Sequence, residues 1–260
     1  MPRSIVKTRA VVLRSRRMGE TSKLVTLYTE ECGKLKLSAR GARRPRSRFG
    51  GSLEPMTEVH AVCYVRDERD LQTLSECDVL RSRDRLAGDL ERLSFGSAAC
   101  ELVDRLTVEG EPNRRLYRCL TGVLEALGGE ELEQSEPVFW YYQLRVAEAL
   151  GYRPELSRCL SCRRDLEGPW LWFSTALGGG LCPSCGEGRG IRVSGEALRF
   201  LGFLQGLKSY RREAMASPPD RRGEIRAMLR GFLEYYGGSR GKLKALEFLE
   251  SVTAGDSNQG

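Results

Sequence analysis

Two pairs of cysteines constrain this chain more tightly than any other feature of its sequence. Cys159-Leu-Ser-Cys162 and Cys182-Pro-Ser-Cys185 are CxxC motifs separated by 19 residues, a spacing typical of four-cysteine zinc sites. Each pair can turn two thiolates toward one ion, and two pairs complete the tetrahedron that structural zinc prefers. We therefore predict that Cys159, Cys162, Cys182 and Cys185 hold one structural Zn²⁺ ion.

The segment between the two pairs is too short to build much core of its own. Trp170 to Phe173 and Gly178 to Gly180 indicate a small hairpin, and metal binding can supply about 10–16 kcal/mol of folding free energy to such a module. Gly186 is expected to provide a positive φ in the second knuckle. Three arginines are expected to neutralise part of the metal centre's negative charge: Arg158, Arg163 and Arg164.

Two redox dithiols are the alternative interpretation of the CxxC pairs. A catalytic zinc would require an open position and usually His or carboxylate ligands, and the one histidine, His60, lies far away in the sequence. No apolar run approaches the length of a membrane span, and no signal peptide is evident at the start, so we expect a cytoplasmic protein with reduced thiols. The other five cysteines show no paired spacing and are interpreted as core residues.

Residues 1–80 have the pattern of short strands. The expected strands are Ile5 to Arg14, Leu24 to Tyr28, Leu35 to Leu37, Thr57 to Arg66 and Asp70 to Leu80, with a hairpin turn at Glu31 to Lys34. Five short strands within 80 residues predict a five-stranded OB-fold barrel that binds nucleic acid. An SH3-like barrel is the alternative.

Beyond about Leu86 the hydrophobic period changes from two to 3.6, which predicts amphipathic helices. We assign residues 81–252 to a helical domain, interrupted at 155–190 by the zinc insert, and residues 253–260 to a disordered tail. Pro137 is expected at a first helical position, a further helix is expected after Ser194, and a short last helix is expected from Lys242 to Leu249. The predicted fold class is therefore α+β and multidomain: a barrel, then a helical bundle with an inserted four-cysteine zinc module.

The positive charge of the chain is concentrated near its start. Residues 1–80 carry 16 Lys and Arg against 10 Asp and Glu, whereas the remaining residues carry 26 against 25. A localised excess is typical of a surface that meets phosphates, although a solvated basic face is the simpler alternative. The densest run, Arg40 to Arg48, contains five arginines and no acid, broken by glycine and proline as in a loop. Phe49, next in the chain, is expected either to stack on a base or to anchor this loop.

With these motifs the sequence resembles the RecO family of recombination mediators over nearly its whole length. A serine, Ser22, stands where the family often has an aspartate. The resemblance rests on Ala10-Val11-Val12-Leu13, Gly19-Glu20, Leu24-Val25 with Leu27, Gly33-Lys34-Leu35, Ala39 to Arg44, Leu53-Glu54-Pro55 and the later CxxC pairs.

The resemblance implies a DNA repair protein that binds single- and double-stranded DNA and anneals complementary strands. It further implies cooperation with RecR in loading RecA onto DNA covered by single-strand-binding protein, and recognition of the acidic C-terminal tail of that protein. The residues expected to bind DNA are Lys34, Lys36, Arg40, Arg43, Arg44, Arg46 and Arg48.

Three other function classes are weaker alternatives. A nucleic-acid enzyme has little support, because the sequence contains neither a GxxxxGK[ST] loop nor an HExxH motif, and we expect no catalysis. A protein adaptor with a structural zinc, whose barrel binds nothing, is the second alternative. An RNA-binding module is the third, which charge does not exclude because arginine does not distinguish the phosphates of RNA from those of DNA.

Overall fold

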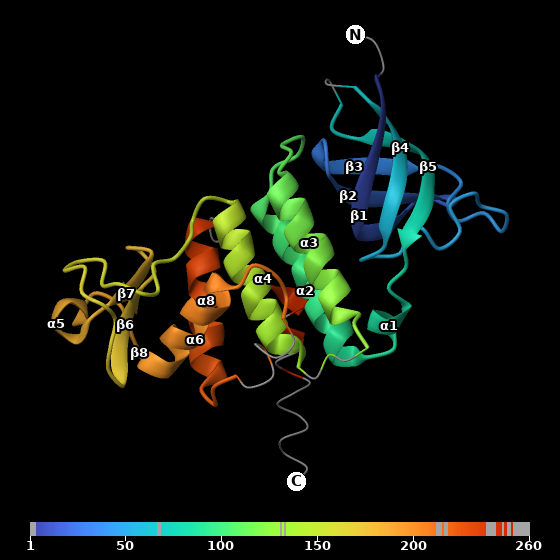
Figure 1. The fold of residues 1–260 in the computed structure, drawn as a ribbon. Helices are drawn as coiled ribbons and strands as arrows, with labels where there is room; N and C mark the ends of the chain where they lie inside the picture. The colour runs from blue at the N-terminus through green and yellow to red at the C-terminus, as the bar shows by residue number, and fades with distance from the viewer. Residues whose placement is uncertain are drawn as a thin grey trace. The chain divides into compact units, whose positions relative to one another are not determined.

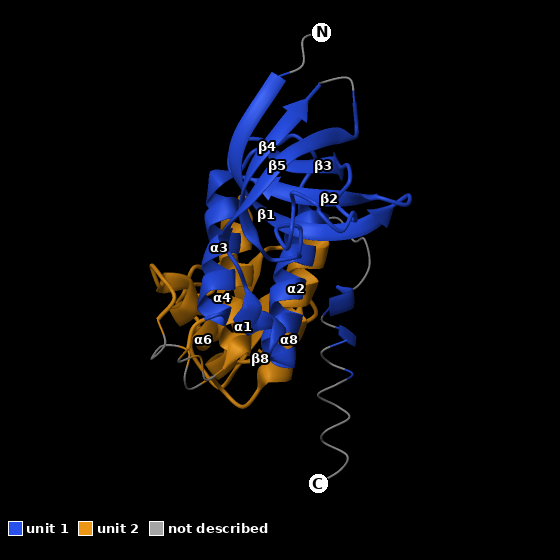
Figure 2. Ribbon diagram, turned by 90° about the vertical axis from the view of Figure 1, so that its right-hand side faces the viewer, with its two compact units in different colours: residues 1–128, 242–260 blue, residues 129–241 orange. Residues whose placement is uncertain are grey.

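The computed structural model of the chain describes residues 4–66, 69–130, 132, 134–211, 215, 218–237, 243–245, 247–248 and 251. The chain forms two compact units (Figure 2). Unit 1 contains residues 1–128 and 242–260, and unit 2 contains residues 129–241. The predicted disordered tail, 253–260, lies outside the described residues.

Unit 1 begins with a closed five-stranded barrel in the order β1-β2-β3-β5-β4 (Figure 1). Neighbouring strands are antiparallel except β3 and β5, which pair in parallel at Leu37–Gln72 and Ser38–Thr73. This is the strand order of an OB-fold, so the predicted barrel is confirmed. Its strands are β1 (Ser4–Met18), β2 (Ser22–Thr29), β3 (Gly33–Ala39), β4 (Glu58–Val65) and β5 (Gln72–Arg81).

The long first strand closes the barrel because it pairs with β2 along one edge and β4 along the other. Its register with β2 shifts between Val12 and Arg14, and such a bulge bends a strand around a barrel. The turn into β3 requires glycine: Gly33 has φ +67°, and a Cβ there would lie 2.1 Å from the Glu111 carbonyl oxygen. The predicted hairpin turn before Leu35 is therefore confirmed.

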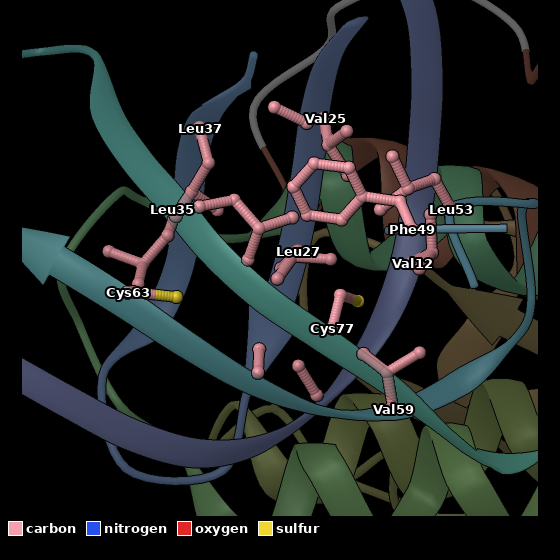
Figure 3. Packing of buried hydrophobic residues seen from close by; sticks show 14 residues of the cluster. Val12, Val25, Leu27, Leu35, Leu37, Phe49, Leu53, Val59, Cys63 and Cys77 are labelled. Atoms are coloured by element: carbon pink, nitrogen blue, oxygen red, sulfur yellow. The ribbon is translucent and has the colours of Figure 1, made fainter. Parts of the chain in front are cut away.

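The barrel core is apolar and draws on the loop that follows β3 as well as on the strands. Figure 3 shows the Phe49 ring inside this cluster, near Val25 and Leu53. Phe49 and Leu53 are only 2% and 1% exposed, although neither belongs to a strand. The loop of residues 40–57 therefore closes one part of the barrel.

Three helices complete the described core of unit 1: α1 (Asp84–Ala87), α2 (Leu90–Leu106) and α3 (Arg114–Leu127). Asp89 caps α2 by accepting a hydrogen bond from the Arg92 N–H, and Asn113 caps α3 in the same way from the Leu116 N–H. The last helix predicted from Lys242 to Leu249 is helical at residues 244–245 and 247–248, and its other positions lie outside the described residues or outside the helix.

In the described part of unit 2, three long packed helices accompany a small sheet in the order β7-β6-β8. The strands and the short helix between them are β6 (Trp170–Ser174), β7 (Gly179–Leu181), α5 (Pro183–Gly186) and β8 (Ile191–Ser194). The long helices are α4 (Ser135–Ala149), α6 (Gly195–Gly206) and α8 (Arg222–Tyr236), and α4 contacts both others. The hairpin of β6 and β7 was predicted, whereas β8 was not.

Two helix starts in unit 2 were predicted from the sequence. As predicted, α6 begins after Ser194, and the structure shows that Ser194 caps this helix by accepting a hydrogen bond from the Ala197 N–H. The prediction for Pro137 is wrong in position, because α4 begins at Ser135 and the proline is its third residue. Proline is tolerated there because the N–H groups of the first turn have no partner within the helix.

Candidate nucleic-acid interface and metal centre

The loop of residues 40–57 is attached to the barrel at both its apolar and its basic parts. Phe49 lies in the barrel core, which shows that it anchors the loop and is not free to stack on a base. The Arg43 guanidinium donates to the carbonyl oxygens of Gly19 and Glu20 at 3.1 and 2.7 Å. These attachments hold the loop against the β1–β2 turn, so its exposed charges have defined positions.

Five guanidiniums of this loop face solvent: Arg40, Arg43, Arg44, Arg46 and Arg48. None of them forms an ion pair with an acid among the residues that the structure describes. Arg48 lies over the Phe49 ring, with its Cζ 5.2 Å from the ring centroid. The predicted basic run is therefore a basic surface, and its charge is not neutralised by described neighbours.

A groove of about 800 Å³ adjoins this surface, where the end of β3 meets the start of β5. Its basic side chains are Arg40, Arg44 and Arg69, and Asp70 adds one carboxylate. Hydroxyl and amide groups beside these charges supply hydrogen bonds suited to a sugar–phosphate backbone. The remaining lining residues are Met18, Thr21, Ser22, Ser38, Gly41, Leu71, Gln72 and Thr73.

The groove contains residues that sequence reasoning missed. Arg69 reaches the predicted loop only because β3 and β5 pair in parallel, bringing the start of β5 beside Arg40. The polar residues Ser38 and Thr73 lie opposite each other in this same pairing. Alternation along each strand marks Ser38 and Thr73 as strand residues, but it carries no information on which strands become neighbours.

Two predicted DNA-binding residues occupy different surroundings from the arginines. Lys34 is only 8% exposed, and its ammonium donates to the carbonyl oxygens of Asp104 and Thr107 at 2.6 and 2.7 Å. The side chain thus satisfies carbonyl groups at the end of α2, where a cation is favourable. Lys36 is exposed and forms an ion pair with Glu109. The structure therefore separates these two lysines from the unpaired charge of the loop.

The four cysteines of the two CxxC motifs converge in unit 2. Their Sγ atoms all lie within 4.8 Å of one another, and those of Cys162 and Cys182 are 3.7 Å apart. Four sulfur atoms about 2.3 Å from a central zinc ion stand about 3.8 Å apart in a tetrahedron. The donor set and spacing therefore fit a metal ion, and they are compatible with zinc.

Local backbone geometry aims each cysteine pair at the shared centre. In the first knuckle the Arg163 N–H donates to the Cys159 carbonyl at 2.9 Å, and Arg163 has φ +62°. In the second, the N–H groups of Cys185 and Gly186 donate to the Cys182 carbonyl at 3.1 and 3.0 Å. Both pairs form tight turns, which bring their two sulfurs to one side.

The expected role of Gly186 is wrong in one respect. Its φ is not positive; the left-handed position of the first knuckle is Arg163 instead. Glycine is required at 186 by close packing, since a Cβ there would lie 2.4 Å from Cβ of Trp172. The second knuckle therefore rests directly on strand β6.

Electrostatics also favour a cation among the four sulfurs. The Arg164 guanidinium, whose Nε donates to Cys162 Sγ at 3.4 Å, lowers the pKa of the Cys162 thiol to about 6. The hydrogen bond with Cys182 raises the pKa of Cys185 to about 11, because it stabilises the protonated thiol. Of the three arginines predicted to neutralise the centre, Arg164 contacts a sulfur, whereas Arg158 forms an ion pair with Asp165.

Comparison with known proteins supplies the family. The model described as "Recombination protein O N terminal" matches residues 1–83, and "Recombination protein O C terminal" matches residues 87–247. The "DNA repair protein RecO" of Pelotomaculum thermopropionicum is 35% identical over 98% of both chains. That of Salinibacter ruber is 37% identical over 90% of this chain and 88% of its own, and that of Anaeromyxobacter sp. strain K is 36% identical over 95% and 96%.

This chain belongs to the RecO family.

Membership in the RecO family confirms the resemblance predicted from the sequence and assigns the chain to a family of DNA repair proteins. The boundary between the two RecO models, residues 83 to 87, falls just after β5. The predicted boundaries at 80, 155 and 190 stay predictions.

Among the described residues of this RecO member, none of the helices has the length and apolar character of a membrane span.

Proposed function

We propose that this chain is a DNA-binding recombination mediator whose barrel loop and adjoining groove hold DNA by its phosphates. The observation that carries the proposal is the exposed surface of five loop arginines, unopposed by acids among the described residues, beside a polar groove. Guanidiniums match phosphate oxygens with forked, charge-assisted hydrogen bonds. We assign DNA contacts to Arg40, Arg44, Arg46 and Arg48, with Arg43 orienting the loop.

Strand annealing follows from the same electrostatics. Two single strands repel each other through their phosphates, and a cationic surface that neutralises both lowers this repulsion and releases condensed counterions. No bond is made or broken, so the proposed function requires no catalytic residue. We propose accordingly that the chain is not an enzyme.

The family supports a wider set of partners. We propose that the chain acts on single- and double-stranded DNA and helps, together with RecR, to load RecA onto DNA coated by single-strand-binding protein. The acidic C-terminal tail of that protein is the proposed docking element. These partners extend the proposal beyond the barrel, and association with the nucleoid would follow from them.

We propose that Cys159, Cys162, Cys182 and Cys185 hold a structural Zn²⁺ ion. All four donors are thiols, and a full set of four leaves no open position for substrate or water. The ion would cross-link the loop before β6 to the turn after β7, in a module with little apolar core. Its contribution is mechanical, because the DNA contacts proposed above lie in the barrel.

A strand-annealing assay tests the proposed function. The double substitution Arg44→Glu and Arg46→Glu should slow annealing and lower DNA affinity by at least about tenfold, with a shallower dependence of affinity on salt. Arg118→Glu, which changes an exposed arginine of α3 in the same unit, is the matched control and should behave nearly as wild type. Repeating the assay on DNA coated by single-strand-binding protein tests the partner.

Three results would contradict the proposal. The first is annealing that does not change between low and high salt. The second is equal activity of the loop variant and wild type. The third is product formation from labelled DNA with Mg²⁺ and ATP, which would favour an enzyme. Preferential binding of RNA of the same sequence would favour the RNA-binding alternative instead.

A further inference from the structure

A second basic and aromatic cluster lies on the small sheet of unit 2. Along β6, Leu171 and Phe173 are buried, whereas Trp170 and Trp172 are only partly buried and lie on the opposite face. The Cζ atoms of Arg192 and Arg221 lie 4.6 and 4.8 Å from the centroid of the Trp170 ring. One indole is thus in contact with two exposed guanidiniums, from β8 and from the start of α8.

The backbone that carries Trp170 is held in place on both sides. The Gly195 N–H donates to the Pro169 carbonyl at 2.8 Å, and the Arg199 guanidinium donates to the Gly168 carbonyl at 3.2 Å. Trp170 itself pairs with Ser194 in the sheet. A rigid aromatic group loses little conformational freedom when a ligand binds, so Trp170 is preorganised for contact.

The two arginines differ in how firmly they are held. Arg221 forms an ion pair with Glu224 at 3.2 Å, and the other oxygen of that carboxylate accepts the Ser194 N–H at 2.8 Å. Arg192 forms no ion pair with any residue that the structure describes. Its contact with the indole can therefore be exchanged for another partner without leaving a buried acid unpaired.

An unpaired base with its phosphate is the ligand that fits this cluster. Stacking of a base on an aromatic side chain is stronger than an exposed cation–π contact, so a base can displace Arg192 from the ring. The displaced guanidinium then meets the adjoining phosphate, and Arg221 stays beside the ring. Bases of a duplex are already stacked on one another and cannot use this surface.

We propose that Trp170 is a stacking platform for one unpaired DNA base, with Arg192 and Arg221 supplying phosphate contacts. This proposal rests on the DNA binding proposed above, and it adds a single-strand site in unit 2. The barrel loop contacts phosphates of either form of DNA, whereas Trp170 distinguishes single strands from duplexes.

Fluorescence anisotropy of the full chain with labelled (dT)20 and with a 20-base-pair duplex tests the platform. Trp170→Ala should weaken binding of (dT)20 about tenfold, the loss expected for one stacked base, and leave duplex affinity unchanged. Trp170→Phe should keep most of the affinity because it keeps a ring. Tyr235→Ala removes another exposed aromatic of unit 2, which lies against Tyr236, and should have no effect.

Intrinsic fluorescence gives a readout that a purely structural role would not change. (dT)20 should quench tryptophan emission of the wild type, and Trp170→Phe should abolish most of this quenching, since Trp140 is buried and Trp172 packs against Gly186 of the second knuckle. Equal quenching in the two proteins would overturn the platform. The platform would also be overturned if the Trp170→Ala variant kept the wild-type affinity for (dT)20, or if it lost affinity for single strands and duplexes equally.

The outcomes separate this proposal from the one on which it rests. Wild-type protein that binds neither DNA would overturn both. Binding that depends on Arg44 and Arg46 but not on Trp170 would overturn the platform alone. Residual (dT)20 binding by the Arg44→Glu, Arg46→Glu variant that disappears when Trp170→Ala is added would support it.

Discussion

At the scale of single residues, buried charges contribute more to the stability of unit 1 than its exposed ion pairs do. Glu58, in β4, is 1% exposed and accepts hydrogen bonds from Arg9 at 2.6 Å and from the Tyr117 hydroxyl at 3.1 Å. Arg81 and Arg83 each lie 3.8 Å from its second oxygen. Burial lowers the pKa of Arg83, so its cation depends on this carboxylate.

Glu58→Gln should therefore destabilise the protein strongly. The substitution keeps the shape but removes the nearby charge that compensates the buried guanidinium, which costs about 3 kcal/mol and lowers the melting temperature by about 5–10 °C. Glu54→Gln is the matched control: it removes the exposed partner of Lys23, an ion pair worth less than about 1 kcal/mol. Thermal unfolding by circular dichroism measures both, and equal shifts would contradict this account.

Residue identity alone predicted some roles and not others. The convergence of the four cysteines could be predicted, because two CxxC pairs at this spacing are typical of a shared metal site, and their sulfurs do converge. The surroundings of Lys34 could not be predicted, since nothing in the sequence of β3 indicates that its ammonium donates to a carbonyl oxygen 70 residues later in the chain. The sequence left two roles open for Phe49, an anchor of the loop or a platform for a base, and only its burial in the structure decides between them.

At the scale of elements, local patterns identified the strands and helices but not their neighbours. Alternation and turn residues located all five barrel strands, and the 3.6-residue period predicted helices beyond Leu86, where α2, α3, α4 and α8 lie. The parallel pairing of β3 with β5 depends on contacts between distant segments, so the groove with Arg69 was not predictable. Strand β8 was missed because Ile191 to Ser194 is short and leads directly into α6.

The metal centre leads to a prediction at this scale. Cys162→Ser should abolish zinc binding and disorder the sheet β7-β6-β8, because the sheet has few apolar residues to replace the cross-link. Duplex binding through the barrel loop should persist, whereas single-strand binding at Trp170 should fall. Metal content after dialysis and near-ultraviolet circular dichroism of the tryptophans measure the first two effects.

Cys119→Ser is the matched control for Cys162→Ser, since Cys119 lies on α3 outside the four-cysteine cluster. It should retain one zinc ion per chain. Retention of zinc by Cys162→Ser, or loss of duplex binding together with the metal, would contradict the separation between a structural zinc and a DNA-binding barrel.

At the scale of the whole molecule, unit 1 is built from both ends of the chain. Residues 243–245, 247–248 and 251, which the structure describes, belong to unit 1 although they follow unit 2 in the chain, and the Glu101 carboxylate accepts the N–H groups of Lys244 and Ala245 at 3.1 and 3.0 Å. The sequence predicted a helical domain of residues 81–252 with an insert at 155–190, and those bounds stay predictions. Hydrophobic period identifies the segment as helical but cannot indicate which unit it joins.

Buried thiols in unit 1 give the whole protein a characteristic response to alkaline pH. Burial raises the pKa of Cys63 and Cys100 to about 12 and that of Cys77 to about 11, from an ordinary value of 9.0. The unfolded chain therefore loses these protons first as pH rises. The stability that these protonated thiols contribute is fully present below about pH 9 and is lost progressively between about pH 9 and 11–12. Over this range each thiol lowers the free energy of unfolding by about 1.4 kcal/mol per pH unit.

Cys77→Ala isolates one of these contributions. The variant has a lower stability at neutral pH, but its free energy of unfolding should fall less steeply between about pH 9.5 and 10.5, by about 1.4 kcal/mol per pH unit. Urea titrations followed by far-ultraviolet circular dichroism at several pH values give this slope. Cys119→Ala, which changes a half-buried thiol on α3, provides the comparison. Parallel pH profiles for wild type and Cys77→Ala would mean that the buried barrel thiols do not cause the alkaline loss of stability.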